Sequence, residues 1–146
     1  MKIFKGRIFS FLRRPVDIND TGSYIYLEEG GVAFDDRGII IEVDDYSKLS
    51  KRYESTETID FGSKIIFPGF IDLHNHFPQT QVIASYGTKL LEWLNKYTFP
   101  NESLFADDMH CKREAKMFLD ILNDNGITTS VSFGSVHPNS VEYLFE

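Results

Sequence analysis

Two histidines, His74 and His76, stand two residues apart at the end of an apolar run, and this spacing is the strongest chemical signal in the sequence. On a β-strand, side chains at positions i and i+2 point to the same side, from Cα atoms roughly 6 to 7 Å apart. Two neutral imidazoles placed in this way reach one metal ion, and zinc binds such nitrogens at about 2.0 to 2.1 Å. A His-x-His pair alone is a weak motif, because two hydrogen-bonded surface histidines give the same pattern. The elements around the pair must therefore decide between the two readings.

The residues around the pair predict a strand over 70–77 with two different faces. One face carries the ionisable side chains and consists of Phe70, Asp72, His74 and His76, and the other consists of Ile71, Leu73, Asn75 and Phe77. Ionisable side chains at the C-terminal end of such a strand suit a closed barrel whose active site lies at its mouth. The strand therefore predicts a functional site at this end.

A long connection, a helix and a second strand follow. Asp107 or Asp108 makes a good helix N-cap, and Asn125-Gly126 makes a good stop signal. Between them the apolar residues recur with helical spacing, namely Cys111, Ala115, Phe118, Leu119 and Leu122. The β-branched run 127–136 predicts a strand, so the elements form a parallel βαβ unit. The connection 77–106, with one short helical segment LLEWL, predicts a lid or binding loop.

The first part of the chain predicts a small β domain. Short runs rich in Ile, Val, Tyr and Phe cover 23–29, 32–36 and 39–45, which predicts a meander broken at Gly30-Gly31. Asp36-Arg37-Gly38 predicts a tight turn, because glycine supplies the positive φ that such a turn needs. The polar segment 46–58 predicts a surface loop. We expect one domain over 1–66 and a second over 67–146.

Composition limits the classes of function. The sequence is 42% hydrophobic and 25% charged, as in an ordinary globular domain. Its 15 basic and 22 acidic residues give a net charge of −7, which argues against a nucleic-acid partner. No apolar run approaches the roughly 18 residues that span a bilayer, and the start has no signal-peptide core, so no membrane partner is expected. The single cysteine, Cys111, fits a reducing compartment, and we expect a cytoplasmic protein.

Four segments together resemble the guanine deaminases of the amidohydrolase superfamily. They read PGFIDLHNHFPQTQVIASYG, LLEWLNKYTFP, NGITT and FGSVHP. Proline and glycine before an apolar strand that ends in His-x-His are typical of the superfamily, and the residues after His76 and the Leu-Glu-Trp-Leu segment point to this branch. The fold that the resemblance implies is α/β, the start of a (β/α)8 barrel of the TIM type preceded by part of a small composite β-sandwich domain.

The resemblance also implies a site and a reaction. His74 and His76 match metal ligands, and a substrate-binding segment matches His76, Phe77, Pro78 and Gln79. Gln79 suits a purine edge best, because an amide offers both a donor and an acceptor. Further candidates beside the metal or in the pocket wall are Asp72, Trp93 and His137. The implied reaction is the hydrolysis of guanine to xanthine and ammonia, with water activated by zinc, or alternatively by iron, in an enzyme that is a homodimer at full length.

Length is at odds with a complete barrel, which takes about 250 residues. The chain has 146 residues, and 67–146 predicts only two strands and one crossover helix. We therefore expect a truncated chain that is inactive alone, with the proton-transferring glutamate and the remaining ligands beyond residue 146 and no catalytic residue assigned within it. Two alternatives stay open. One is an inactive remnant or interaction fragment, and the other is an amidohydrolase that acts on another aminated or halogenated heterocycle.

Overall fold

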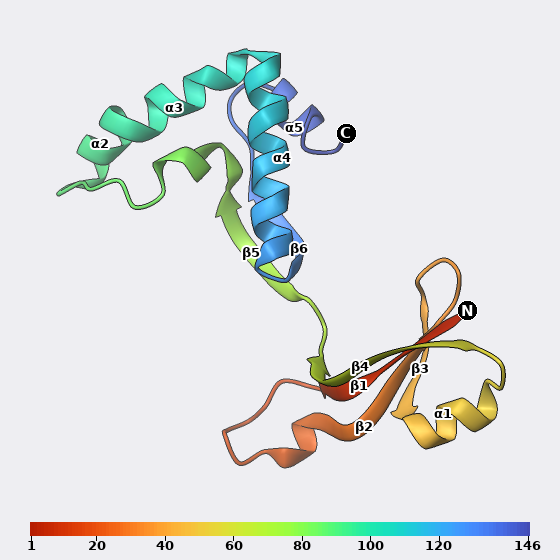
Figure 1. Ribbon diagram of the computed structural model, residues 1–146. Coiled ribbons are helices and arrows are strands. Elements are labelled where there is room, and N and C mark those ends of the chain that lie inside the picture. The colour runs from red at the N-terminus through yellow and green to blue at the C-terminus, as the bar shows by residue number, and fades with distance from the viewer. The chain divides into compact units, whose positions relative to one another are not determined.

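The computed structural model describes all 146 residues, which divide into two compact units, Met1–Pro68 and Gly69–Glu146 (Figure 1). The first unit is built on a four-stranded sheet, and the second on a two-stranded sheet with helices. The protein is therefore of mixed α/β class, as predicted. None of its helices combines the length and the apolar character needed to cross a membrane.

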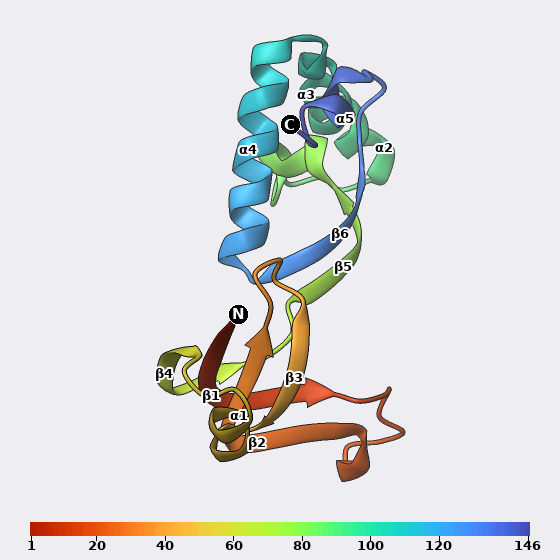
Figure 2. The ribbon, with the colours of Figure 1, turned by 90° about the vertical axis from the view of Figure 1, so that its right-hand side faces the viewer.

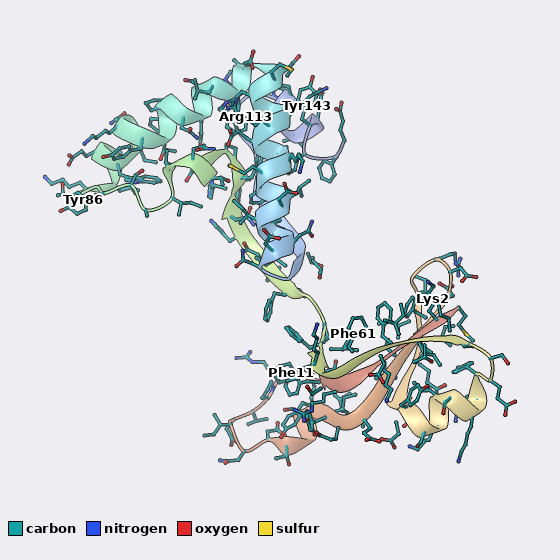
Figure 3. The ribbon with its side chains drawn as sticks, in the orientation of Figure 1. Lys2, Phe11, Phe61, Tyr86, Arg113 and Tyr143 are labelled. Atoms are coloured by element: carbon teal, nitrogen blue, oxygen red, sulfur yellow. The ribbon has the colours of Figure 1, made fainter.

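The sheet of the first unit has the strand order β3-β2-β1-β4. Its strands are β1 (Lys2–Phe11), β2 (Tyr24–Phe34), β3 (Ile40–Asp45) and β4 (Glu57–Ile66), and a short 3-10 turn, η1 (Thr21–Ser23), precedes β2. The first three strands pair antiparallel as a meander, whereas β4 pairs parallel with β1. Aromatic side chains of paired strands contact one another. The ring of Phe61 in β4, labelled in Figure 3, lies 5.2 Å from the ring of Phe4 in β1. The predicted meander therefore accounts for three of the four strands.

Two predictions for this unit are wrong. β2 continues through Gly30-Gly31. Both positions require glycine, because neighbouring side chains occupy the space where a Cβ would lie. A Cβ on Gly30 would lie 2.4 Å from Cγ1 of Ile8, and one on Gly31 would lie 2.9 Å from Cδ1 of Leu49. The segment predicted as a loop begins with a helix, α1 (Tyr46–Arg52), which buries Leu49 in a core with Ile3 and Ala33.

The predicted tight turn between β2 and β3 is confirmed. Gly38 has a φ of +80°, the left-handed region that favours glycine. Oδ1 of Asp35 accepts hydrogen bonds from the backbone N–H groups of Arg37 and Ile39, both at 2.9 Å. The turn is thus closed by a carboxylate as well as by its glycine.

The second unit is the predicted parallel βαβ arrangement. β5 (Phe70–His76) and β6 (Ile127–Phe133) pair in parallel, and α4 (Asp108–Asp124) lies between them in the sequence and along the pair in space (Figures 1 and 2). Asp107 is the N-cap and accepts from the backbone N–H of His110 at 2.7 Å. The stop is also confirmed, since Asn125 is the C-cap and Gly126 has a φ of +69°. β6 ends at Phe133, three residues before the predicted end at Val136.

The buried face of α4 contains four of the five residues predicted for it, Cys111, Ala115, Phe118 and Leu122. Leu119 is 41% exposed, because it lies at the edge of the apolar stripe. Glu114 is buried at the opposite edge of the stripe and is only 2% exposed. Figure 3 marks this helix by Arg113, and it marks the segment after α5 (Asn139–Glu142) by Tyr143.

The connection between β5 and α4 is far more helical than predicted. It contains η2 (Phe77–Val82), α2 (Leu90–Trp93), the π-helical η3 (Leu94–Thr98), α3 (Phe99–Ser103) and the 3-10 turn η4 (Leu104–Ala106). It also supplies the core, because Phe77 and Phe105 are each 1% exposed. The Phe77 ring lies 5.4 Å from that of Phe105 and 5.6 Å from that of Phe118. The connection is therefore a packed part of the second unit.

Candidate functional site

The two histidines of the motif lie together on β5. The ring centroids of His74 and His76 are 5.3 Å apart, and both side chains are exposed. Two imidazoles that share one zinc ion, each at about 2.0 to 2.1 Å, have centroids about 5 Å apart at a tetrahedral angle. The observed separation therefore fits a shared metal ion.

An aromatic residue missed by the sequence reasoning supports this pair. The Phe133 ring lies 5.2 Å from that of His74 and 4.8 Å from that of His76, and it stacks on the latter with an interplanar angle of 16°. The β5–β6 register places Phe133 directly beside His76. Only the pairing of the two strands identifies this neighbour, because 57 positions separate the two residues in the numbering.

No third ligand accompanies the pair. Throughout the 146 residues, no group of three or more His, Cys, Asp or Glu side chains is arranged to hold a metal ion. Catalytic zinc is usually held by three protein ligands and a water. The residues present thus fit two positions of such a centre.

The predicted assignment of Asp72 and Asn75 to opposite faces of β5 is wrong. β6 pairs Ser130 with Asp72 and Ser132 with Asn75, so three steps along β5 match two along β6. This irregularity breaks the alternation of period two. Oδ2 of Asp72 consequently accepts from Nδ2 of Asn75 at 2.9 Å, and the same amide donates to Oγ of Ser130 at 2.6 Å. The hydrogen bond from Asn75, followed by one from the backbone N–H of His74, lowers the pKa of Asp72.

A cavity of about 500 Å³ lies along β5, η2 and α4, and its lining extends from His76 at the end of β5 to Ile127 at the start of β6. Four predicted site residues line it, namely Asp72, His76, Gln79 and Trp93. The indole of Trp93 is fixed by a hydrogen bond from its Nε1 to the carbonyl oxygen of Ser85 at 3.0 Å. The volume falls within the range of about 300 to 1,000 Å³ that is usual for small-molecule sites.

The side-chain amide of Gln79 contacts two polar groups. Its Nε2 donates to Oε1 of Glu102 at 2.9 Å and lies 3.4 Å from Nδ1 of His76. Glu102 belongs to α3 and was not among the predicted residues, since no motif signals a contact between positions 23 apart. Its neighbour Asn101 donates its amide to the carbonyl oxygen of Pro78. α3 therefore holds the segment that follows the histidines.

Three other predicted residues lie away from this cavity. The Phe77 side chain belongs to the hydrophobic core of the second unit. Pro78 is also buried. His137 does not line the cavity and instead lies in the loop after β6. There its carbonyl oxygen accepts from Oγ of Ser140 at 2.7 Å, and its N–H donates to Oγ of Ser135 at 3.1 Å.

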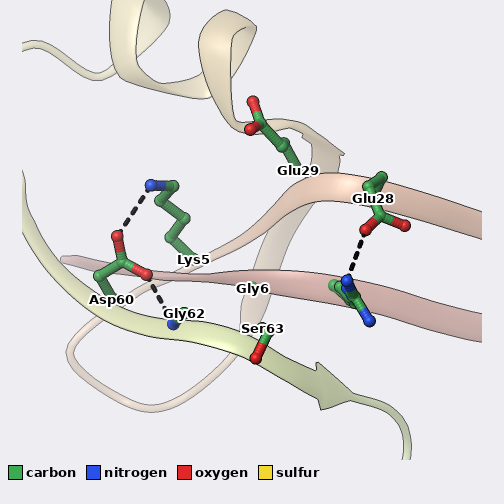
Figure 4. A pocket seen from close by; sticks show the side chains of 8 residues that line it. Lys5, Gly6, Glu28, Glu29, Asp60, Gly62 and Ser63 are labelled. Atoms are coloured by element: carbon green, nitrogen blue, oxygen red, sulfur yellow. Dashed lines mark hydrogen bonds and ion pairs between the residues drawn. The ribbon is translucent and has the colours of Figure 1, made fainter.

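The first unit has a separate hollow of about 260 Å³ between charged side chains of β1, β2 and β4 (Figure 4). Nζ of Lys5 lies 2.8 Å from Asp60, and Arg7 lies 2.8 Å from Glu28. The hydrogen bond with Asp60 raises the pKa of Lys5. The hollow contains none of the predicted site residues, and its basic side chains are already paired with acidic ones.

Sequence comparisons find guanine deaminases among the proteins similar to this chain. No protein-family model matches the chain. The guanine deaminase of Escherichia coli (strain K12) is 47% identical over 87 residues, which cover 60% of this chain and 20% of that protein. A probable guanine deaminase of Deinococcus radiodurans is 30% identical over 149 aligned residues, which cover 99% of this chain and 34% of that protein.

Solved structures agree with the sequence comparison. The guanine deaminase of Bradyrhizobium japonicum matches with a TM-score of 0.94 and 34% identity, over 99% of this chain and 31% of that one. A guanine deaminase of C. acetobutylicum with guanine bound in its active site matches with a TM-score of 0.83 and 32% identity, over 99% of this chain and 32% of that one. The chain thus spans no more than 34% of the length of these relatives. Over that span, its sequence and its fold show that it belongs to the guanine deaminase family of amidohydrolases.

Proposed function

We propose that the protein hydrolyses guanine to xanthine and ammonia, and that residues 69–146 supply part of the active site. The observation that carries the proposal is the pair His74 and His76, whose rings lie 5.3 Å apart, together with the cavity that His76 and Gln79 line. The guanine-bound structure of the relative from C. acetobutylicum supports the choice of substrate.

The proposed architecture follows the same relatives. Residues 67–146 form the start of a (β/α)8 barrel, which the parallel pair β5 and β6 with its crossover helix supports. Residues 1–66 form part of a β-sandwich domain, which the sheet of the first unit supports. Because the relatives are about three times as long, the remaining ligands and the proton-transferring glutamate are assigned to none of the residues described.

His74 and His76 are the residues that would hold a divalent metal ion, zinc or alternatively iron. Their exposure and the spacing of their rings suit this role, and imidazole nitrogens are accepted by both metals. A bound ion would supply the activation of water for hydrolysis near neutral pH. Phe133 supports the two rings from the neighbouring strand and limits their rotation.

Gln79 and Trp93 would bind the base. The amide of Gln79 is suited to a purine edge that carries both donors and acceptors, and the fixed indole of Trp93 gives the cavity an apolar wall. Asp72 would act on the site only through its hydrogen bonds with Asn75 and the backbone of His74. A cytoplasmic location and a homodimeric full-length enzyme stay predictions.

Ammonia release from guanine, adenine and cytosine tests the proposal. The protein is first freed of metal with a chelator and then assayed with and without added zinc or iron. In the full-length enzyme we expect metal-dependent release from guanine, its loss in His74→Ala and His76→Ala, and a selective loss of guanine turnover in Gln79→Ala. Preference for another base would indicate a different heterocycle as substrate. A folded protein that binds no metal and releases no ammonia would indicate an inactive remnant or an interaction fragment.

A further inference from the structure

The amide of Gln79 is fixed with its nitrogen toward a carboxylate. Nε2 donates to Oε1 of Glu102 at 2.9 Å, while the oxygen Oε1 of Gln79 receives no hydrogen bond from the chain. Gln79 lines the 500 Å³ cavity, and Glu102 is partly buried on α3. One end of the amide is thus engaged, and the other is left for a ligand.

A carboxylate determines which end of an amide faces it. An ionised Glu102 only accepts hydrogen bonds, so the reverse orientation of Gln79 would place two acceptor oxygens against each other. A neutral partner with both donor and acceptor groups would allow either orientation. The charge of Glu102 therefore selects the orientation in which Oε1 of Gln79 is free.

The backbone of the same segment is held independently of this bond. Asn101 donates to the carbonyl oxygen of Pro78, and Gln81 donates through Nε2 to Oε2 of Glu114 at 2.7 Å. Phe77 anchors the start of η2 in the core. The Gln79–Glu102 bond is thus one of several ties, and its particular effect is on the side-chain amide rather than on the course of the backbone.

We propose that Glu102 is a positioning residue that sets the substrate preference of the site. By holding Nε2 of Gln79, it presents Oε1 as an acceptor for an N–H group on the edge of a bound heterocycle. Guanine carries such donors at its ring N–H and its amino group. This inference rests on the proposed function, and it concerns a residue outside the metal-binding motif.

The variant Glu102→Gln is the sharpest test, because it keeps the shape of the side chain and removes the charge. Both amide orientations of Gln79 then become populated, and only one presents the acceptor. In the full-length enzyme we expect KM for guanine to rise about two-fold, because the orientation that binds falls to about half of the molecules. We expect kcat to stay unchanged, since this contact is made equally in the ground state and the transition state. A matched control is Glu114→Gln, which alters the same kind of bond at Gln81 and is expected to leave KM for guanine unchanged.

A double-mutant cycle with Gln79→Ala separates positioning from a structural effect. If Glu102 acts through Gln79, the double variant Gln79→Ala/Glu102→Gln has the same KM for guanine as the single variant Gln79→Ala. Multiplicative effects of the two changes would overturn the proposal, as would a Glu102→Gln protein with the KM of the unaltered one. If Glu102→Gln does not fold, Glu102→Asp replaces it in the test. Because Glu102→Asp keeps the carboxylate, it is expected to retain the preference for guanine over 1-methylguanine, which lacks the ring N–H.

A second measurement does not depend on turnover. Nitrogen-15 spectra of the chain are expected to show one Nε2 proton of Gln79 shifted by its hydrogen bond and slow to exchange. In Glu102→Gln this proton is expected to shift toward the value of an unbonded amide and to exchange faster. Unaltered resonances would overturn the inference even if guanine were turned over. Absence of guanine turnover in the full-length enzyme would instead contradict the proposed function, and the spectra would still decide whether Glu102 orients the amide.

Discussion

His76 and Phe133 lie ring on ring, with centroids 4.8 Å apart and an angle of 16° between their planes. The parallel register of β5 and β6 makes them direct neighbours. An aromatic side chain on one strand therefore supports a proposed metal ligand on the next. Rotation of the imidazole away from its present position would cost this contact.

Replacing Phe133 with alanine is expected to weaken zinc binding by about ten-fold, the lower end of the effect of residues that orient metal ligands. Titration calorimetry of the metal-free protein with zinc gives the affinity. Val131→Ala is the matched control, because Val131 is exposed on the same strand and makes no ring contact with the histidines. Equal zinc affinities for Phe133→Ala and the unaltered protein would show that the stacking does not orient the ligand.

The core of the second unit depends on an aromatic residue in the connection. Phe105 is 1% exposed and packs against Phe77 and the ring of His110. Phe105→Ala should lower the free energy of unfolding by about 3 to 5 kcal/mol, because it removes buried apolar area and leaves a cavity. Urea denaturation measures the change, with Phe99→Ala as the control since Phe99 is 52% exposed. Similar losses of unfolding free energy in both variants would contradict the prediction that burial of Phe105 stabilises the second unit.

The turn between β2 and β3 requires glycine. Gly38 has a φ of +80°, and a Cβ there would meet no atom within 4 Å, so a substitution affects the backbone conformation alone. Gly38→Ala is expected to cost about 1 to 2 kcal/mol of stability, the usual penalty of a left-handed residue with a side chain. Gly22→Ala, at a glycine without a positive φ, serves as the control in the same thermal denaturation. A Gly38→Ala protein as stable as the control would contradict the prediction.

Acid should destabilise the same turn. The backbone hydrogen bond from Ile39, with further bonds from Arg37, lowers the pKa of Asp35. Because the folded pKa is the lower one, the carboxylate stabilises the folded protein above the unfolded pKa of about 3.9, and this contribution is lost as the pH falls through the folded value. The midpoint of thermal unfolding should therefore differ between Asp35→Asn and the unaltered protein at pH 6, and the difference should shrink toward pH 2.5.

The control for that comparison is Glu54→Gln, at an exposed acid in the loop after α1. Its midpoint is expected to follow that of the unaltered protein across the pH range. A constant gap between Asp35→Asn and the unaltered protein would show that ionisation of Asp35 does not contribute.

Local patterns in the sequence predicted the second unit well where short-range forces decide. The ends of α4 follow from the Asp107 cap and from the left-handed Gly126, and both signals act within one turn of helix. The buried stripe of α4 was predicted from its period, apart from Leu119 at the edge. The loop 46–58 was misread because α1 is stabilised by burying Leu49 against β1 and β2, which its polar composition does not reveal.

The sequence by itself determined that two imidazoles point to the same side of a strand, since the period of a strand depends only on backbone geometry. It did not determine the place of Asp72, because the irregular pairing of β5 with β6 shifts the alternation between that residue and Asn75. Nor did it indicate Phe133 beside His76 or Glu102 beside Gln79. Only the tertiary structure brings these pairs together, because their contacts depend on strand register and helix packing between residues far apart in the chain.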